Sequence, residues 1–203
     1  MKITNAVFQS SAPDLAACPE SDLPEFAFIG RSNVGKSSLI NMLTREEGLA
    51  KVSRVPGKTR LINFFTINNT WSLVDLPGYG YAKVGKKERS SFSAFVAEYL
   101  QRRPNLLGTF VLIDCRLSPQ KLDLEFLQWM VGCGLPFVIA FTKADKLTGK
   151  AAQKNIAAFL AAMREISEEP PDYVLSSSKS DTGRTEILGL IASALDAKQE
   201  FFA

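Results

Sequence analysis

Short apolar runs alternate with amphipathic segments along the chain after residue 25. Near-continuous apolar runs are typical of parallel strands that are covered on both faces, and they lie at residues 26–30, 109–114, 137–142 and 173–176. Between these runs, apolar residues recur at the i, i+3, i+4 spacing of one helix face, at residues 92–100, 126–133, 156–163 and 187–195. The alternation predicts an α/β protein with a mostly parallel sheet.

One segment departs from this alternation and predicts a β-hairpin. Residues 61–67 and 70–75 are two strand-like runs joined by Asn68-Asn69, a dipeptide suited to a tight turn. The hairpin would give the sheet one antiparallel edge strand. Residues 1–24, punctuated by Pro, Ser and Asp, are predicted to form an N-terminal extension in which residues 3–9 are a candidate extra strand. Residues 25–203 are predicted to form one three-layer α/β domain.

The composition excludes several kinds of catalytic site. The 203 residues include no histidine and only three cysteines, Cys18, Cys115 and Cys133. The lack of histidine excludes Ser-His-Asp and Cys-His catalytic sites and the usual histidine-bound catalytic zinc. Three cysteines without a short spacing predict neither a disulfide framework nor a thiolate metal site. A reducing, cytoplasmic location is therefore expected.

Positive charge is concentrated in one part of the chain. Residues 31–103 contain 13 Lys and Arg against 5 Asp and Glu, although the formal net charge of the whole chain is only +3. The excess has two interpretations, an ordinary solvated face or a surface that binds a polyanion such as RNA. Residues 1–13 lack the apolar core of a signal peptide, and the longest uncharged stretch, residues 126–142, is short and interrupted by Gly and Pro. No membrane association is expected.

A phosphate-binding motif follows the first predicted strand. The pattern G-x-x-x-x-G-K-S lets backbone N–H groups surround a phosphate at a helix N-terminus, here ahead of a helix predicted at residues 37–44. Lys36 would contact the β- and γ-phosphates, and the Ser37 hydroxyl would bind Mg²⁺. The strand before and the helix after disfavour the alternative of a plain glycine-rich turn. The candidate residues are Gly30, Arg31, Ser32, Asn33, Val34, Gly35, Lys36, Ser37 and Ser38.

Two further segments are candidates for contact with the metal and the γ-phosphate. Asp75-Leu76-Pro77-Gly78 ends the second hairpin strand, where a carboxylate can hold Mg²⁺ through water and the glycine N–H can contact the γ-phosphate. Gly57-Lys58-Thr59-Arg60 lies in the loop before the hairpin, and Thr59 is the candidate for a second hydroxyl ligand of Mg²⁺. Each segment alone would be an ordinary turn or loop. Their order after the phosphate-binding motif favours the functional interpretation.

The last two predicted strands end in residues that can select guanine. Thr142-Lys143-Ala144-Asp145 follows one strand, and a carboxylate there can accept hydrogen bonds from guanine N1–H and the exocyclic amine. Adenine has an acceptor at N1, so the same carboxylate disfavours it. The Lys143 stem would pack along the base, and a backbone N–H in Ser176-Ser177-Ser178 would contact guanine O6. Because ligands of open α/β sheets bind at the carboxyl ends of strands, these segments together predict a guanine-nucleotide site.

These motifs resemble those of the bacterial EngB GTPases over essentially the whole chain. The most specific segments are residues 30–37, residues 61–65 and Asp75-Leu76-Pro77-Gly78-Tyr79-Gly80-Tyr81-Ala82. The resemblance implies a Mg²⁺-dependent GTPase with a Ras-like P-loop fold, acting in assembly of the large ribosomal subunit and hence needed for normal cell division and septation. It assigns Mg²⁺ to Ser37 and Thr59. It assigns GTP contacts to residues 30–37, Gly57-Lys58-Thr59-Arg60-Leu61, residues 75–78, residues 142–145 and Leu175-Ser176-Ser177-Ser178.

The residue that follows Gly78 bears on the rate of hydrolysis. A Ras-type switch has a water-orienting glutamine there, whereas this sequence has Tyr79 and no histidine to replace it. Hydrolysis is therefore expected to be slow alone, to rely on Lys36, Thr59 and Mg²⁺, and to be stimulated by a partner, with residues 79–85 as a mobile switch segment. We also hypothesise that Asn33 helps to hold K⁺, because related GTPases with Asn in this part of the loop can do so.

The expected protein is a cytoplasmic monomer that binds GTP and GDP and contacts the large ribosomal subunit or its rRNA. The alternative is a GTP-binding structural or regulatory protein that acts directly in septation with little hydrolysis. A P-loop nucleoside kinase is disfavoured because it has no use for the guanine-selecting motif at residues 142–145.

Overall fold

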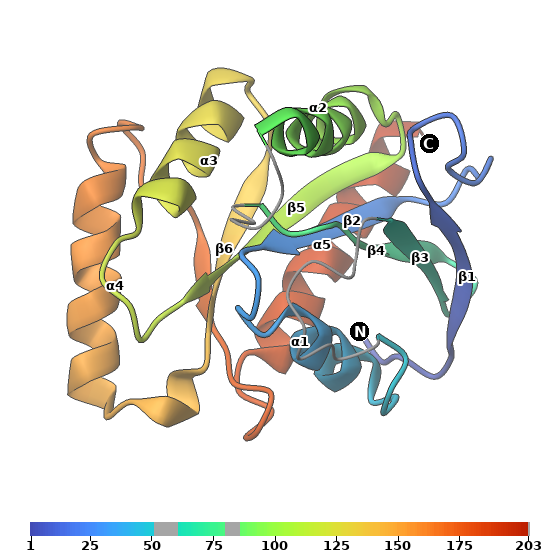
Figure 1. Ribbon diagram of the computed structural model, residues 1–203. Coiled ribbons are helices and arrows are strands. Elements are labelled where there is room, and N and C mark those ends of the chain that lie inside the picture. The colour runs from blue at the N-terminus through green and yellow to red at the C-terminus, as the bar shows by residue number, and fades with distance from the viewer. Residues whose placement is uncertain (51–60, 80–85, 203) are drawn as a thin grey trace.

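A single seven-stranded sheet organises the computed structural model, which describes residues 1–50, 61–79 and 86–202. The strands lie in the order β1-β3-β4-β2-β5-β6-β7 (Figure 1). Their bounds are β1 (Ala6–Ala12), β2 (Glu25–Gly30), β3 (Ile62–Ile67), β4 (Trp71–Asp75), β5 (Leu106–Asp114), β6 (Phe137–Thr142) and β7 (Tyr173–Leu175).

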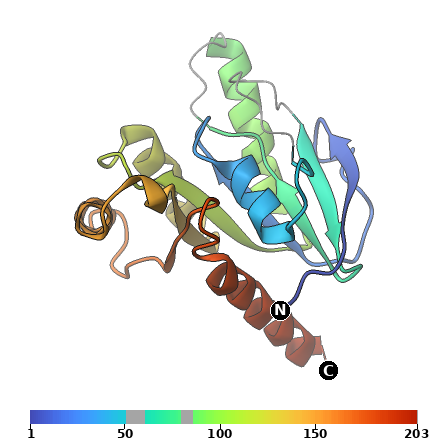
Figure 2. The same cartoon turned by 90° about the horizontal axis from the view of Figure 1, so that it is seen from below.

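Helices cover both faces of the sheet and make three layers. One apolar core joins the sheet to α2 (Lys86–Arg102), α3 (Lys121–Gly132) and α4 (Gly149–Met163). A second core, on the opposite face, joins it to α1 (Lys36–Thr44) and α5 (Arg184–Phe202). The two views in Figures 1 and 2 show α4 and β1 at opposite ends of the sheet. A short 3-10 turn, η1 (Ala144–Lys146), follows β6.

The central strand β2 shows why the apolar runs form buried strands. All six of its residues are buried, and it pairs in parallel with β4 on one side and β5 on the other. Ala27 and Ile29 pack into the first core, whereas Phe26 and Phe28 pack into the second. Side chains alternate between faces along a strand, so a strand covered on both faces must be apolar at successive positions. The prediction of a mostly parallel, three-layer α/β fold is confirmed.

The predicted hairpin is present as β3 and β4, with Asn68 and Asn69 in the turn at φ values of 50° and 55°. The turn contains Asn68, Asn69 and Thr70 between the paired residues Ile67 and Trp71, and Asn adopts the left-handed conformation more readily than most residues. One detail of the sequence prediction is wrong, because the antiparallel strand β3 does not form the edge of the sheet. β1 pairs antiparallel with β3 and occupies the edge instead. The extra strand thus exists, but it begins at Ala6 rather than residue 3.

Asn68 also holds the N-terminal segment in place. Its side-chain oxygen accepts hydrogen bonds from the Thr4 N–H at 2.8 Å and the Asn5 N–H at 3.1 Å, and its side-chain nitrogen donates to the Lys2 carbonyl at 2.8 Å. The hairpin turn therefore fixes the chain just ahead of β1. β1 in turn pairs with the backbone groups of β3, which would otherwise be unpaired at an open edge.

A buried charge cluster connects the start of β2 to the end of α2. Glu25 is only 1% exposed, and its carboxylate accepts hydrogen bonds from the Tyr99 hydroxyl at 2.6 Å and from Arg103 Nη2 at 2.6 Å. Arg103 Nη2 also donates to the Pro19 carbonyl at 2.7 Å. The cluster therefore ties the N-terminal residues to the helical layer, and its charges are paired as buried charges must be.

We expect Glu25→Ala to lower the free energy of unfolding by about 3–5 kcal/mol, because it leaves the buried Arg103 guanidinium without its partner. Urea denaturation measures the change. The matched control is Glu98→Ala, because Glu98 pairs with Arg102 at 3.5 Å on the exposed surface and such pairs contribute about 0–1 kcal/mol. Equal losses in the two variants would contradict the assigned role of the Glu25 cluster.

Candidate functional site

The loop between β2 and α1 has the backbone conformation that a phosphate-binding motif needs. Asn33 and Gly35 adopt left-handed conformations with φ values of 63° and 106°, and α1 begins at the next residue, Lys36. A Cβ atom at Gly30 would lie 2.8 Å from the Leu112 carbonyl oxygen, so only glycine leaves room for the loop to start there. The loop therefore ends at a helix N-terminus, where unpaired N–H groups favour an anion.

Lys36 and Asp75 meet inside this region. Asp75 ends β4 and is 5% exposed, and the Lys36 ammonium contacts its Oδ1 atom. Burial lowers the pKa of the Lys36 ammonium to about 7, whereas the adjacent carboxylate favours the charged form. A phosphate in the loop would offer Lys36 further negative charge. The sequence placed these two residues in separate motifs, and the fold brings them into contact.

The turn after Asp75 packs directly against the phosphate-binding loop. The Leu76 N–H donates to the Phe28 carbonyl at 3.0 Å and continues the alignment of β4 with β2. A Cβ atom at Gly78 would lie 2.6 Å from the Gly30 carbonyl oxygen. Any other residue at position 78 would push the two backbones apart. The glycine is therefore required for close approach of the turn to the loop.

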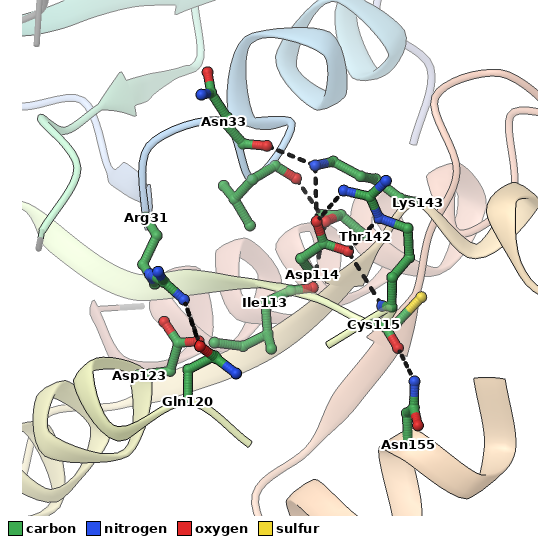
Figure 3. Close-up of polar contacts among 12 residues, drawn as sticks. Arg31, Asn33, Ile113, Asp114, Cys115, Gln120, Asp123, Thr142, Lys143 and Asn155 are labelled. Atoms are coloured by element: carbon green, nitrogen blue, oxygen red, sulfur yellow. Dashed lines mark hydrogen bonds and ion pairs between the residues drawn. The ribbon is translucent and has the colours of Figure 1, made fainter. Parts of the chain in front are cut away.

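The end of β6 is bonded to the same loop. The Thr142 hydroxyl donates to the Val34 carbonyl at 2.7 Å, and the Lys143 ammonium donates to the Asn33 carbonyl at 2.6 Å. Figure 3 shows both side chains directed at the loop. Lys143 itself is in a left-handed conformation, with φ of 63°. Its stem passes 3.7 Å from the position of a Cβ at Gly35. The candidate base-binding and phosphate-binding segments thus form one connected structure.

Asp145 is exposed but held in place by a neighbouring loop. Its Oδ1 atom accepts a hydrogen bond from the Ser177 hydroxyl at 2.8 Å, and the Ala144 N–H donates to the Ser176 carbonyl at 3.1 Å. The bond from Ser177, followed by contacts with Lys146, lowers the pKa of the Asp145 carboxyl. The group is therefore ionised near neutral pH and acts as an acceptor. Leu175 is the last residue of β7, and Ser178 lies in the segment that follows this strand.

Asp114 belongs to the site but was not among the sequence candidates. It is 9% exposed at the end of β5 and accepts hydrogen bonds from Lys143 Nζ at 2.8 Å and from Arg116 Nε at 2.9 Å (Figure 3). Burial raises the pKa of the Asp114 carboxyl, but the bonds from Arg116 and Lys143 outweigh it and hold the pKa below its usual value. An acidic residue that ends an apolar strand, as Asp75 does, is the sequence signal that could have identified it.

Four of the predicted site segments lie at the carboxyl ends of β2, β4, β6 and β7, and β5 lies between β2 and β6 in the sheet. These segments are residues 30–38, 75–78, 142–145 and 175–178. Gly57, Lys58, Thr59 and Arg60 lie outside the described residues, as do residues 80–85 of the predicted switch segment. Leu61 is described, lies just before β3 and is 40% exposed. Over the described ranges, none of the helices is both long and apolar enough to cross a membrane.

Comparison with known proteins agrees with this arrangement. Residues 25–143 match the model of a family described as 50S ribosome-binding GTPase, so fold and motifs define a GTPase domain. The chain is 54% identical over 193 residues to a probable GTP-binding protein EngB of Bacteroides fragilis, covering 95% of this chain and 96% of the relative. A Porphyromonas gingivalis protein of the same description is 52% identical over the same shares of the two chains.

A solved structure of a probable GTP-binding protein EngB covers 85% of this chain and 99% of its own, with a TM-score of 0.68 and 22% identity. At that identity the match supports the fold alone. The full-length sequence matches carry the assignment, and the chain belongs to the EngB family of GTP-binding proteins. The resemblance identified from the motifs is confirmed.

We expect Asp114→Asn to weaken guanine-nucleotide binding about tenfold, because the amide removes the charge that holds Lys143 and Arg116 in place. Titration of the purified variant with GDP measures the change. Glu125→Gln is the matched control, because within the described part of the chain Glu125 makes an exposed pair with Lys121 at 3.7 Å on α3. Unaltered GDP affinity in Asp114→Asn, with the same melting temperature as the control, would show that Asp114 does not support the site.

Proposed function

We propose that this protein binds GTP and GDP and hydrolyses GTP to GDP and phosphate as a molecular switch. The observation that carries the proposal is the direct bonding between the candidate base-binding and phosphate-binding segments, through Lys143 and the Asn33 carbonyl. A nucleotide with its base beside residues 142–145 and its phosphates in the loop at residues 30–38 would contact both. Membership of a GTPase family supports the same activity.

Guanine selection follows from the ionised state of Asp145. A carboxylate that already accepts one hydrogen bond from Ser177 has a fixed orientation, and its remaining lone pairs can accept from guanine N1–H and the exocyclic amine. Adenine would place an acceptor against it, which is unfavourable. Ser176 and Ser177 are each 1% exposed, so the loop that orients Asp145 is itself well packed.

Oxygen ligands suited to Mg²⁺ are present at the phosphate-binding end of the site. The Asp75 carboxylate lies at the end of β4, and Ser37 lies in the first turn of α1. No cluster of three or more His, Cys, Asp or Glu capable of holding a metal occurs among the described residues. Mg²⁺ commonly binds through one or two protein oxygens together with water and phosphates. Ser37 would therefore bind the ion directly, Asp75 would bind it through water, and we assign Thr59 as a further ligand.

We propose that hydrolysis is slow without a partner. The Mg²⁺ ion and Lys36 would stabilise charge on the phosphate oxygens, but the position of the water-orienting glutamine is occupied by Tyr79 and the chain contains no histidine. A partner would supply the missing group.

We further propose that Asn33 helps to hold K⁺ beside the phosphates. Turnover would then be faster in KCl than in NaCl at equal ionic strength, and Asn33→Ala would abolish the difference.

We propose the large ribosomal subunit, through its rRNA, as that partner. The matched family is described as 50S ribosome-binding, and the basic excess of residues 31–103 provides the charge that rRNA contact requires. The protein would act as a cytoplasmic monomer in assembly of the subunit. Normal cell division and septation would depend on it through the supply of ribosomes.

We expect Asp145→Asn to exchange guanine for xanthine preference. The amide donates where the carboxylate accepted, so GDP binding should weaken and xanthosine diphosphate binding should strengthen, each by about 1–3 kcal/mol. Titration with both nucleotides measures the exchange. Asp181→Asn is the control, because Asp181 is exposed and, among the described residues, pairs with Arg45 at 3.8 Å. Unchanged preference in Asp145→Asn would contradict the base assignment.

Depletion of the protein from its own cells is expected to reduce mature large subunits and accumulate large-subunit precursors, because an assembly step would lack its switch. Sucrose-gradient profiles measure both species. Complementation with the unaltered gene should restore the profile, whereas Lys36→Ala, which removes the phosphate-binding ammonium, should not. Normal large subunits after depletion would contradict the ribosomal role and leave GTP binding as a separate question.

A further inference from the structure

The Tyr79 side chain contacts the start of α3. Its hydroxyl donates to Asp123 Oδ1 at 3.0 Å, and its ring stacks on Phe126 with centroids 4.3 Å apart and planes at 15°. Asp123 is 3% exposed and lies in the first turn of α3. Tyr79, which occupies the position of the water-orienting glutamine, is thus hydrogen-bonded to α3.

The same carboxylate also faces the phosphate-binding loop. Arg31 places its Nη1 atom 3.9 Å from Asp123 Oδ2 and donates to Gln120 Oε1 at 3.5 Å (Figure 3). The two oxygens of Asp123 therefore serve two different segments, one that follows Gly30 and one that follows Gly78. Burial raises the pKa of the Asp123 carboxyl, and Tyr79 and Arg31 oppose that shift. Burial of a carboxylate is unfavourable, and the contacts with Tyr79 and Arg31 offset part of this free-energy cost.

We propose that Asp123 is a positioning residue for the γ-phosphate, because it holds Tyr79 and Arg31 and so fixes the Gly78 N–H beside the phosphate-binding loop. The inference rests on the proposed GTP binding and assigns a further residue to that site. Gly78 is confined on one side by the Gly30 carbonyl, which would lie 2.6 Å from a Cβ at position 78. Tyr79 provides the restraint on the other side.

The restraint should matter for GTP and not for GDP. A turn that is already in position loses little conformational freedom when a ligand binds it. GDP lacks the γ-phosphate and would make no use of the Gly78 N–H. Loss of the Asp123 contacts should therefore weaken binding of a GTP analogue selectively. A role limited to stabilising α3, where a carboxylate in the first turn is favourable, would lower the melting temperature and leave this selectivity unaltered.

The test compares Tyr79→Phe, Asp123→Ala and the double variant. Tyr79→Phe removes only the hydroxyl and retains the ring that stacks on Phe126. Dissociation constants for GDP and for a non-hydrolysable GTP analogue are measured with Mg²⁺, together with the melting temperature. We expect each single variant to weaken analogue binding about 5–10-fold and to leave GDP binding within about twofold. The double variant should bind the analogue no more weakly than Asp123→Ala alone, because Asp123→Ala already removes the contact with the Tyr79 hydroxyl that Tyr79→Phe removes.

Glu125→Gln is the control on the same helix and should leave both dissociation constants unaltered. If Tyr79→Phe and Asp123→Ala leave the analogue-to-GDP ratio at the wild-type value, whether or not they lower the melting temperature, Asp123 is a structural residue and the inference is overturned. Strictly additive losses in the double variant would overturn it as well. Failure of the unaltered protein to bind GDP at all would instead overturn the proposed function, and this inference with it.

Discussion

The candidate site depends on the Lys143 ammonium, which connects its separate segments. The ammonium donates to the Asn33 carbonyl at 2.6 Å and to Asp114 Oδ2 at 2.8 Å, so one side chain joins the ends of β5 and β6 to the phosphate-binding loop. The Thr142 hydroxyl adds a second bond to that loop, at the Val34 carbonyl. Charge-assisted bonds of this kind are short and directional. The distance between the candidate base-binding segment and the phosphate-binding loop is therefore set by contacts within the protein.

The apolar core determines where the polar residues of the site can lie. Strands that are apolar on both faces bring polar residues together only where they end, and Asp75, Asp114 and Thr142 all occupy such positions. Each is nearly buried and each is bonded to another part of the site. A buried polar group without a partner costs about 1–3 kcal/mol. The same bonds that prepare the site therefore contribute to the stability of the fold, and a change at one strand end affects both.

The sequence predicted those features that depend on neighbouring residues. Apolar runs predicted the buried strands, Asn68-Asn69 predicted the hairpin turn, and the glycine-lysine motif predicted the loop before α1. The register of the pairing between β1 and β3 could not be predicted from the sequence. β1 is mostly exposed, and its apolar and polar residues alternate only weakly. The contacts of Asp114 and Asp123 join residues far apart in the chain, such as Arg31 and Asp123. Only the folded sheet brings such pairs together, so no local pattern identifies them.

Isothermal titration of the purified protein with GDP and, in parallel, with ADP in the presence of Mg²⁺ tests the central claim most directly. The two ligands carry the same phosphates, so a difference between them reports on the base-binding segment, and binding at all reports on the phosphate-binding loop. The account predicts one GDP bound per chain and at least 100-fold weaker binding of ADP, in the range expected when a carboxylate meets an acceptor in place of a donor. Equal affinity for the two nucleotides, or no binding of GDP, would contradict it.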